Sequence, residues 1–283
     1  MSKASTQYKQ YIDLATIEEV TRVFESVTSI QIRQIRDRVV ASREFFHELW
    51  SMYVQLRVDS NSPVSSFLPT QNLNRTAVIL ISSEDTLSGS IDEQLVDEVL
   101  GSVNQQTTDF YVIGKKGAKL LRSQGIVPTK VYPLPDITKP VNVVPIISAT
   151  QDYKNTMVYF EQFINLTTQQ VQVFELVSGI TRLSEAEESQ RDSTLIFSSD
   201  YIFEPSLEEV VIYLESMMRA TALTELILES RLAQLASRFR AMSRASTAAG
   251  VQKKQVYKHY HQMQRQRSDA NNRVFVRDPK GIL

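Results

Sequence analysis

The sequence predicts an α/β protein in which two long terminal helices pair as an antiparallel coiled coil beside a central α/β lobe. A heptad pattern of mostly apolar residues runs from Leu207 to Ala249, and residues 14–57 contain neither Gly nor Pro. Between them, short apolar segments alternate with helical stretches. The chain has 283 residues, of which 42% are hydrophobic and 22% charged, enough for more than one domain. We expect three parts, at 1–60, 75–200 and 206–275.

The C-terminal helix has a clear start signal. Pro205 closes the preceding segment, and Ser206 with Glu209 has the spacing of a capping box. No proline follows until Pro279, so the helix should be on the order of 100 Å long and needs a partner along its length. The apolar positions that we assign to its coiled-coil seam include Leu228, Leu235, Phe239 and Met242.

The N-terminal segment 14–57 supplies that partner. Its first half carries an apolar stripe at helical spacing, and we assign Val20, Phe24 and Val27 of this stripe to the same seam. Because the two helices lie at opposite ends of the chain, they can pair antiparallel while the intervening residues fold as a lobe. A heptad seam is also compatible with a homodimeric coiled coil, which stays an alternative at this point.

The middle of the chain is typical of a Rossmann-like α/β lobe. Strands that alternate with helices indicate a largely parallel sheet. The loops after the first two strands lack both GxGxxG and the phosphate-loop signature, and Glu84 with Asp85 would repel phosphate. We therefore expect no nucleotide site. Strands are expected at 76–82, 109–114, 171–180 and 194–199, and helices near 91–104 and from 115.

Composition excludes several chemistries. Without cysteine there is no disulfide, thiol catalysis or Cys-ligated zinc. The three histidines lie in the helical arms, so neither a metal site nor a Ser/His/Asp arrangement can be assembled. No apolar run is long enough to span a bilayer, and the N-terminus lacks a signal-peptide core. We expect no catalytic residue, no cofactor, no metal and no direct membrane span.

Charge is strongly segregated, although the net charge is −1. No acidic residue occurs between Glu229 and Asp269, a stretch that includes "LASRFRAMSRASTAAG" at 235–250. Blocks of one charge often mark nucleic-acid patches or disordered tails. Neither reading fits well here, because the block lies inside a helical pattern.

Several strings, in order along nearly the whole chain, resemble the gamma subunit of the F-type ATP synthase. "VIGKKGAKLL" is close to identical with that family's usual string, "YIFEPS" matches its Tyr-x-Phe-Glu-Pro-Ser, and "ILISSEDTLSGS" is similar to its Ser-Ser-Asp-Arg-Gly-Leu-Cys-Gly loop. "EVTRVFESVTSIQIRQI" and "RFRAMSRASTAA" resemble its first-helix and last-helix patterns. Each match is weak alone, but five in the right order are specific.

The resemblance implies a rotor shaft that couples ion flow through a membrane ring to ATP synthesis or hydrolysis, itself without a catalytic residue. It implies alpha and beta subunits in a hexameric collar, an epsilon-type subunit and a membrane c-ring as partners, on the cytoplasmic face of an energy-coupling membrane. The stretch without acidic residues between Glu229 and Asp269 would then contact acidic loops of the collar rather than nucleic acid. The small residues at 245–249 would let the two helices approach closely. The residues that this assigns to partner contacts are Arg238, Arg240, Arg244, Arg265, Gln266 and, near the ring, Glu204.

The sequence also departs from the family. Leu14, Ala15 and Glu19 stand where Val and two Lys are usual, and Ser243 and Thr247 replace Lys and Asp. The C-terminal Arg-Gln pair of the family could be Arg265 and Gln266 or be offset by one. The alternative function is a gamma-derived coiled-coil scaffold or rotor of a specialised ATPase complex that does not act as a synthase.

Overall fold

The structure is a computed structural model that describes residues 3–59, 73–84, 88–136, 139–176, 204 and 206–277. The chain divides into two compact units. One consists of Met1–Ser29 and Phe239–Leu283, and we call it the helical unit. The other is Ile30–Arg238, which we call the sheet unit because it holds all of the described strands.

The sheet unit contains a five-stranded sheet in the order β3-β2-β1-β4-β5. The central strand β1 pairs in parallel with β2 and with β4, and β2 pairs in parallel with β3. The pairing of β4 with β5 is antiparallel. The carboxyl ends of four strands therefore meet at one edge of the sheet. The strands are β1 (Leu73–Ile81), β2 (Thr108–Ile113), β3 (Lys130–Tyr132), β4 (Tyr153–Phe163) and β5 (Gln169–Glu175).

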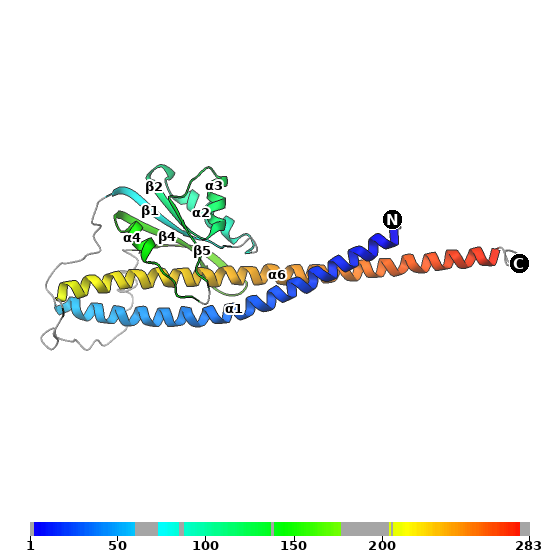
Figure 1. Cartoon of the computed structure of the whole chain (residues 1–283), viewed down its shortest axis with the longest axis horizontal. Coiled ribbons are helices and arrows are strands. Elements are labelled where there is room, and N and C mark those ends of the chain that lie inside the picture. Colours follow the sequence, from blue (N-terminus) through cyan, green and yellow to red (C-terminus); the bar gives the residue numbers. More distant parts are fainter. Residues whose placement is uncertain are drawn as a thin grey trace. The chain divides into compact units, whose positions relative to one another are not determined.

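Helices cover both faces of this sheet, and alternate residues of β1 show the two layers. Val78 and Leu80 pack with buried residues of α2 (Ile91–Ser102) and α3 (Lys115–Ser123). Ala77, Ile79 and Ile81 face the other way, onto α4 (Val144–Thr150) and α6 (Leu207–Arg277). Figure 1 shows α2 and α3 on one side of the strands and α6 on the other. Because both faces are covered, β1 is apolar at successive positions instead of alternating with polar residues.

Two long helices, α1 (Lys3–Asp59) and α6, each contribute to both units. The α6 helix begins where the sequence predicts, since the backbone N–H of Glu209 donates to the Ser206 hydroxyl at 3.2 Å. Within the sheet unit the helices are antiparallel: Tyr53 of α1 donates to Glu215 of α6 at 2.9 Å, whereas Ile35 packs near Leu235.

A twelve-residue stretch of α6 in the sheet unit, 226–237, contains no exposed residue. Leu226 and Ile227 pack onto the sheet and α4. Leu228, Leu232 and Leu235 pack against Ile35 and Val39 of α1. We call this stretch the enclosed segment of α6.

In the helical unit, α1 and α6 also run antiparallel. The Tyr8 ring lies 5.6 Å from that of Tyr260, and the Tyr11 ring lies 5.4 Å from that of Tyr257, measured between centroids. Further along α1, Glu18 forms an ion pair with Lys253 of α6. The contacts that join the two helices here are thus largely aromatic and polar.

The assignment of Val20, Phe24 and Val27 to the coiled-coil seam is wrong. Their side chains are 46%, 42% and 46% exposed, whereas the neighbouring Thr21 and Thr28 are buried. The two threonine hydroxyls donate to carbonyls of their own helix, Ile17 and Phe24, each at 2.7 Å. Small side chains that satisfy their own polar atoms can occupy the seam, so the larger apolar residues face outward.

Unlike those on α1, the seam residues predicted on α6 are buried or half-buried. Leu228 and Leu235 in the sheet unit and Met242 in the helical unit are buried, and Phe239 is half-buried. On α6 the large apolar residues recur at regular spacing and mark the buried face. On α1 in the helical unit, the apolar stripe and the face that meets α6 are different sides of the helix.

The predicted fold class, two long terminal helices with a central α/β lobe, is confirmed, and the sheet is largely parallel as expected. Four expected elements correspond to β1, β2, α2 and α3, and the strand expected at 171–180 corresponds to β5. The strand expected at 194–199 and Pro205 lie outside the described residues. The sequence did not predict β3, α4 or the long strand β4.

Leu235 and Val27 provide a matched test of these placements. Leu235→Glu puts a carboxylate into the buried contact with α1 and should lower the free energy of unfolding by about 3 to 5 kcal/mol. Val27→Glu should change it by less than about 1 kcal/mol, because the position is exposed and Glu is at least as good a helix former as Val. Urea unfolding of the full chain, followed by circular dichroism, measures both. Equal losses would contradict the placement of the two residues.

Candidate partner-contact surfaces

The outward face of α1 in the helical unit is apolar. Six large apolar residues between 40% and 60% exposed lie within an arc of about 140° at 100° per residue. Their arc is centred away from Thr21 and Thr28, which mark the side that meets α6. Scattered exposed apolar residues are ordinary, but a continuous stripe marks an interaction site. This α1 apolar stripe consists of Ile12, Ile17, Val20, Val23, Phe24 and Val27.

The α6 helix of the helical unit is basic on its exposed side. Its exposed cations are spread over about six turns, and no acidic residue precedes Asp269 in this part of α6. A surface of one sign attracts partners of the opposite sign and steers their approach. Four of these cations lie within an arc of about 80° at 100° per residue, and we call them the α6 basic surface: Arg244, Lys254, Lys258 and Arg265.

One acid of α1 faces α6 and pairs with a cation of that helix. Glu18 contacts Lys253 with its Oε2 at 2.5 Å and Arg22 of its own helix at 3.1 Å. The hydrogen bond from Lys253 lowers the pKa of Glu18 below its usual value. The backbone of α6 comes close here, since a Cβ on Gly250 would lie 3.4 Å from the Glu18 carboxylate. Lys253 is therefore occupied within the chain and is not part of the α6 basic surface.

The structure separates the residues predicted to contact partners into two groups. Arg244, Arg265 and Gln266 are exposed on α6 in the helical unit, and Glu204 is exposed just before α6 begins. Arg238 and Arg240 are half-buried and interact within the chain. The small residues expected to let the helices approach closely differ in exposure. Ala249 is buried, but Thr247 and Ala248 are exposed.

In the sheet unit, the carboxyl ends of the strands are filled by the protein's own polar groups. The buried Asp92 carboxylate accepts from the backbone N–H of Ser83 at 2.8 Å and from the Ser88 hydroxyl at 2.5 Å. Lys116 lies 3.2 Å from the same carboxylate and donates to the Gly89 carbonyl at 3.0 Å. Loops that hold phosphate in related sheets keep their N–H groups free for the ligand. Here the backbone N–H of Ser83 is bonded to the Asp92 carboxylate instead.

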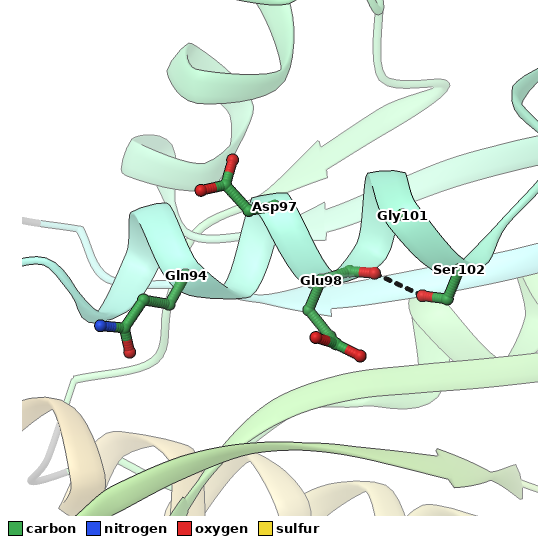
Figure 2. A pocket seen from close by; sticks show the side chains of 5 residues that line it. All are labelled: Gln94, Asp97, Glu98, Gly101 and Ser102. Atoms are coloured by element: carbon green, nitrogen blue, oxygen red, sulfur yellow. Dashed lines mark hydrogen bonds between the residues drawn. The ribbon is translucent and has the colours of Figure 1, made fainter.

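Two surface hollows lie elsewhere on the sheet unit. One of about 520 Å³ runs along α2 and is lined by Gln94, Asp97, Glu98, Gly101 and Ser102. In Figure 2, Asp97 points to one side of α2 and Glu98 to the other, so the two carboxylates do not converge on one point. The second, of about 560 Å³, is more apolar and lies between α1, α6 and the turn from β4 to β5, next to Ile32, Phe163 and Leu232.

Within the described ranges, no group of three or more His, Asp and Glu side chains is arranged to hold a metal ion. None of the helices described here has an apolar stretch long enough to cross a membrane. The α1 apolar stripe and the α6 basic surface are the candidate surfaces for partner contact in the helical unit.

Comparison with solved structures relates the fold to rotary ATP synthases. The rotor of the Euglena gracilis mitochondrial ATP synthase matches 93% of this chain and 98% of its own, with a TM-score of 0.60 and 12% identity. A chain of the central stalk and c-ring of the Tetrahymena thermophila mitochondrial ATP synthase matches 80% of this chain and 99% of its own, with a TM-score of 0.56 and 19% identity. At these identities the likeness concerns the fold.

Sequence comparison gives the family. A family model described as ATP synthase matches residues 9–268. The ATP synthase gamma chain of Psychrobacter sp. (strain PRwf-1) is 24% identical over 251 residues, 84% of each chain. That of Legionella pneumophila (strain Corby) is 23% identical over 245 residues, 82% of this chain and 83% of the relative. The chain belongs to the ATP synthase gamma family.

Proposed function

We propose that the chain is the gamma subunit, the central rotor shaft, of an F-type ATP synthase. The observation that carries the proposal is that the family match runs through α1, the sheet unit and α6 together, from residue 9 to residue 268. In this role the chain contributes no catalytic group. It transmits rotation driven by ion flow through a membrane ring to a collar of alpha and beta subunits, where ATP is made or hydrolysed. The stalk lies on the cytoplasmic face of the membrane.

The mechanism follows from the asymmetry of the paired helices. One outward face of the helical unit is the α1 apolar stripe and another is the α6 basic surface. A shaft with chemically different faces stabilises a different conformation of each collar subunit that it meets, so turning it changes which conformation is favoured. The α1 apolar stripe would contact apolar side chains of the collar, and the α6 basic surface would contact acidic loops.

The composition of the native complex tests this function. Chain purified from its own cell with its partners attached should carry alpha and beta subunits, an epsilon-type subunit and the c-ring, and rotation should couple ATP hydrolysis to ion transport. Mass spectrometry of the subunits and an ion-transport assay measure the two properties. A complex that contains the chain but lacks the c-ring would instead support a scaffold or rotor of a specialised ATPase, the alternative function.

Charge reversal tests the α6 basic surface. Arg244→Glu with Arg265→Glu should leave the helical content unchanged, because both positions are exposed and Arg and Glu are similar helix formers. Affinity for the alpha–beta collar should fall by about tenfold or more at low salt and by less at high salt, where surface charges are screened. Binding titrations at two salt concentrations measure this.

The matched control carries the same change of charge on the sheet unit. Lys119→Glu with Arg122→Glu alters two exposed cations of α3 and should leave collar affinity unchanged. An equal loss in both double variants would attribute the effect to net charge alone. Salt-sensitive binding of DNA or RNA by the wild-type chain, abolished only in the α6 double variant, would overturn the assignment of this surface to a protein partner.

Glu204 tests the placement of the start of α6. This exposed residue precedes the helix and is expected near the membrane ring and the epsilon-type subunit. A photo-crosslinking amino acid at position 204 in the native complex should give a product with one of these two partners, identified by mass spectrometry. Crosslinks to alpha or beta alone would contradict the placement. The same group at Asn165, which is exposed in the turn between β4 and β5, provides the comparison.

A further inference from the structure

A carboxyl group lies fully buried where the sheet meets α6, in a part of the sheet unit that the proposed function does not use. Glu161, near the carboxyl end of β4, is 0% exposed. Its Oε2 lies 3.1 Å from the hydroxyl of Ser230, which belongs to the enclosed segment of α6. The side-chain amide of Gln234, one turn further along α6, donates to the same hydroxyl at 3.2 Å. These three side chains join β4 to α6.

The charged groups around Glu161 do not neutralise it. Asp92 of α2 is the acid that acts on it, and Lys116 of α3 is the cation. Lys116 is already held at 3.2 Å by Asp92 and at 3.1 Å by Glu93. The α6 residues that face Glu161, Ser230 and Gln234, are both uncharged. An ionised Glu161 would be a buried charge beside a second carboxylate, which is costly.

Two oxygens of this network have no hydrogen-bond partner within ordinary distances, although the Gln234 amide also acts on the Glu161 carboxyl. Glu161 Oε1 and Gln234 Oε1 are both buried acceptors without a hydrogen-bond partner. The Ser230 hydroxyl has a single proton, yet two acceptors lie beside it: Glu161 Oε2 at 3.1 Å and the Ile81 carbonyl at 3.4 Å. A proton on Glu161 supplies a further donor to this network. The protonated carboxyl oxygen becomes a donor, so the Ser230 hydroxyl can donate to the Ile81 carbonyl instead.

We propose that Glu161 is held as a neutral carboxylic acid in the folded protein, and that its proton completes the hydrogen bonds that fasten β4 to the enclosed segment of α6. Loss of this proton leaves an uncompensated charge between the sheet and the helix, so the contact loosens. The fastening of the sheet to α6 is thereby sensitive to pH. This inference concerns the sheet unit alone and does not depend on the proposed rotor function.

The direction of the pH effect follows from linkage. Burial first, and then the Asp92 charge, raise the pKa of Glu161 well above the ordinary value of 4.5. When the contact opens, the carboxyl regains an ordinary pKa and loses its proton at any pH above 4.5. The open state therefore binds fewer protons than the closed state, and the closed state loses stability as pH rises from 4.5 towards the raised pKa.

Infrared spectroscopy of the full chain tests the protonation state directly. At pH 7, wild type should show the C=O band of a protonated carboxylic acid, and Glu161→Gln should lose it. Glu229 of α6 is a matched control, because burial also raises its pKa while it lies on the same helix. Glu229→Gln should keep the Glu161 band. A spectrum at pH 7 that is identical in wild type and Glu161→Gln would overturn the proposal.

Hydrogen exchange measures the mechanical consequence. After correction for the intrinsic exchange rate, protection of peptides covering 155–163 and 226–238 should fall above pH 4.5 more steeply in wild type than in Glu161→Gln, by about tenfold per pH unit, and Glu229 accounts for the slope that the variant keeps. Wild-type protection that is independent of pH, or an equal slope in both proteins, would overturn the coupling. If Glu161→Gln does not fold, the infrared band of a Glu229→Gln chain at pH 7 decides, since its absence there contradicts a neutral Glu161.

Discussion

The sheet unit depends on one constraint: residues 226–237 of α6 pack against both the sheet and α1, and none of them is fully exposed. Leu226 and Ile227 fill the space beneath the sheet, while Leu232 and Leu235 fill the space against α1. A helix that is buried all round has no solvent-facing side on which to place its polar residues. The buried side chains of this stretch must therefore be apolar, small, or supplied with a hydrogen-bond partner from the elements around it, whereas Glu229 and Arg231 are only half-buried.

The polar residues of the enclosed segment meet this requirement at the carboxyl ends of the strands. Ser230 is bonded to Gln234 and to Glu161, and Ser237 lies close to the loop after β1. At Gly89 of that loop a Cβ would approach the Ser237 hydroxyl to 3.1 Å, and the φ of +73° is one that glycine adopts without strain. In many α/β sheets this edge holds a ligand. Here α6 and Asp92 cover it.

The helical unit follows a different rule along the same two helices. Its seam holds threonines, a glutamate paired with Lys253, and tyrosines in ring contact, while the larger apolar residues of α1 face outward. Polar seams contribute less hydrophobic stabilisation than apolar ones. The exposed apolar residues of α1 are the surface that the proposed collar subunits would cover.

The sequence by itself determined the long helices, the largely parallel sheet and the lack of a nucleotide loop, because these follow from local signals: a heptad of apolar residues, the Ser206 cap and short apolar strands. It also placed Arg244 and Arg265 on a basic face, since charge segregation is visible along the chain. Only the tertiary structure decided which face of α1 meets α6. Val20, Phe24 and Val27 give an apolar stripe whether that stripe is buried or exposed, and periodicity cannot tell a core from a docking surface. The burial of Glu161 could not be predicted from the sequence either. A carboxyl group is buried and kept neutral only when residues distant in the sequence pack around it, and Ser230 is 69 positions away from Glu161.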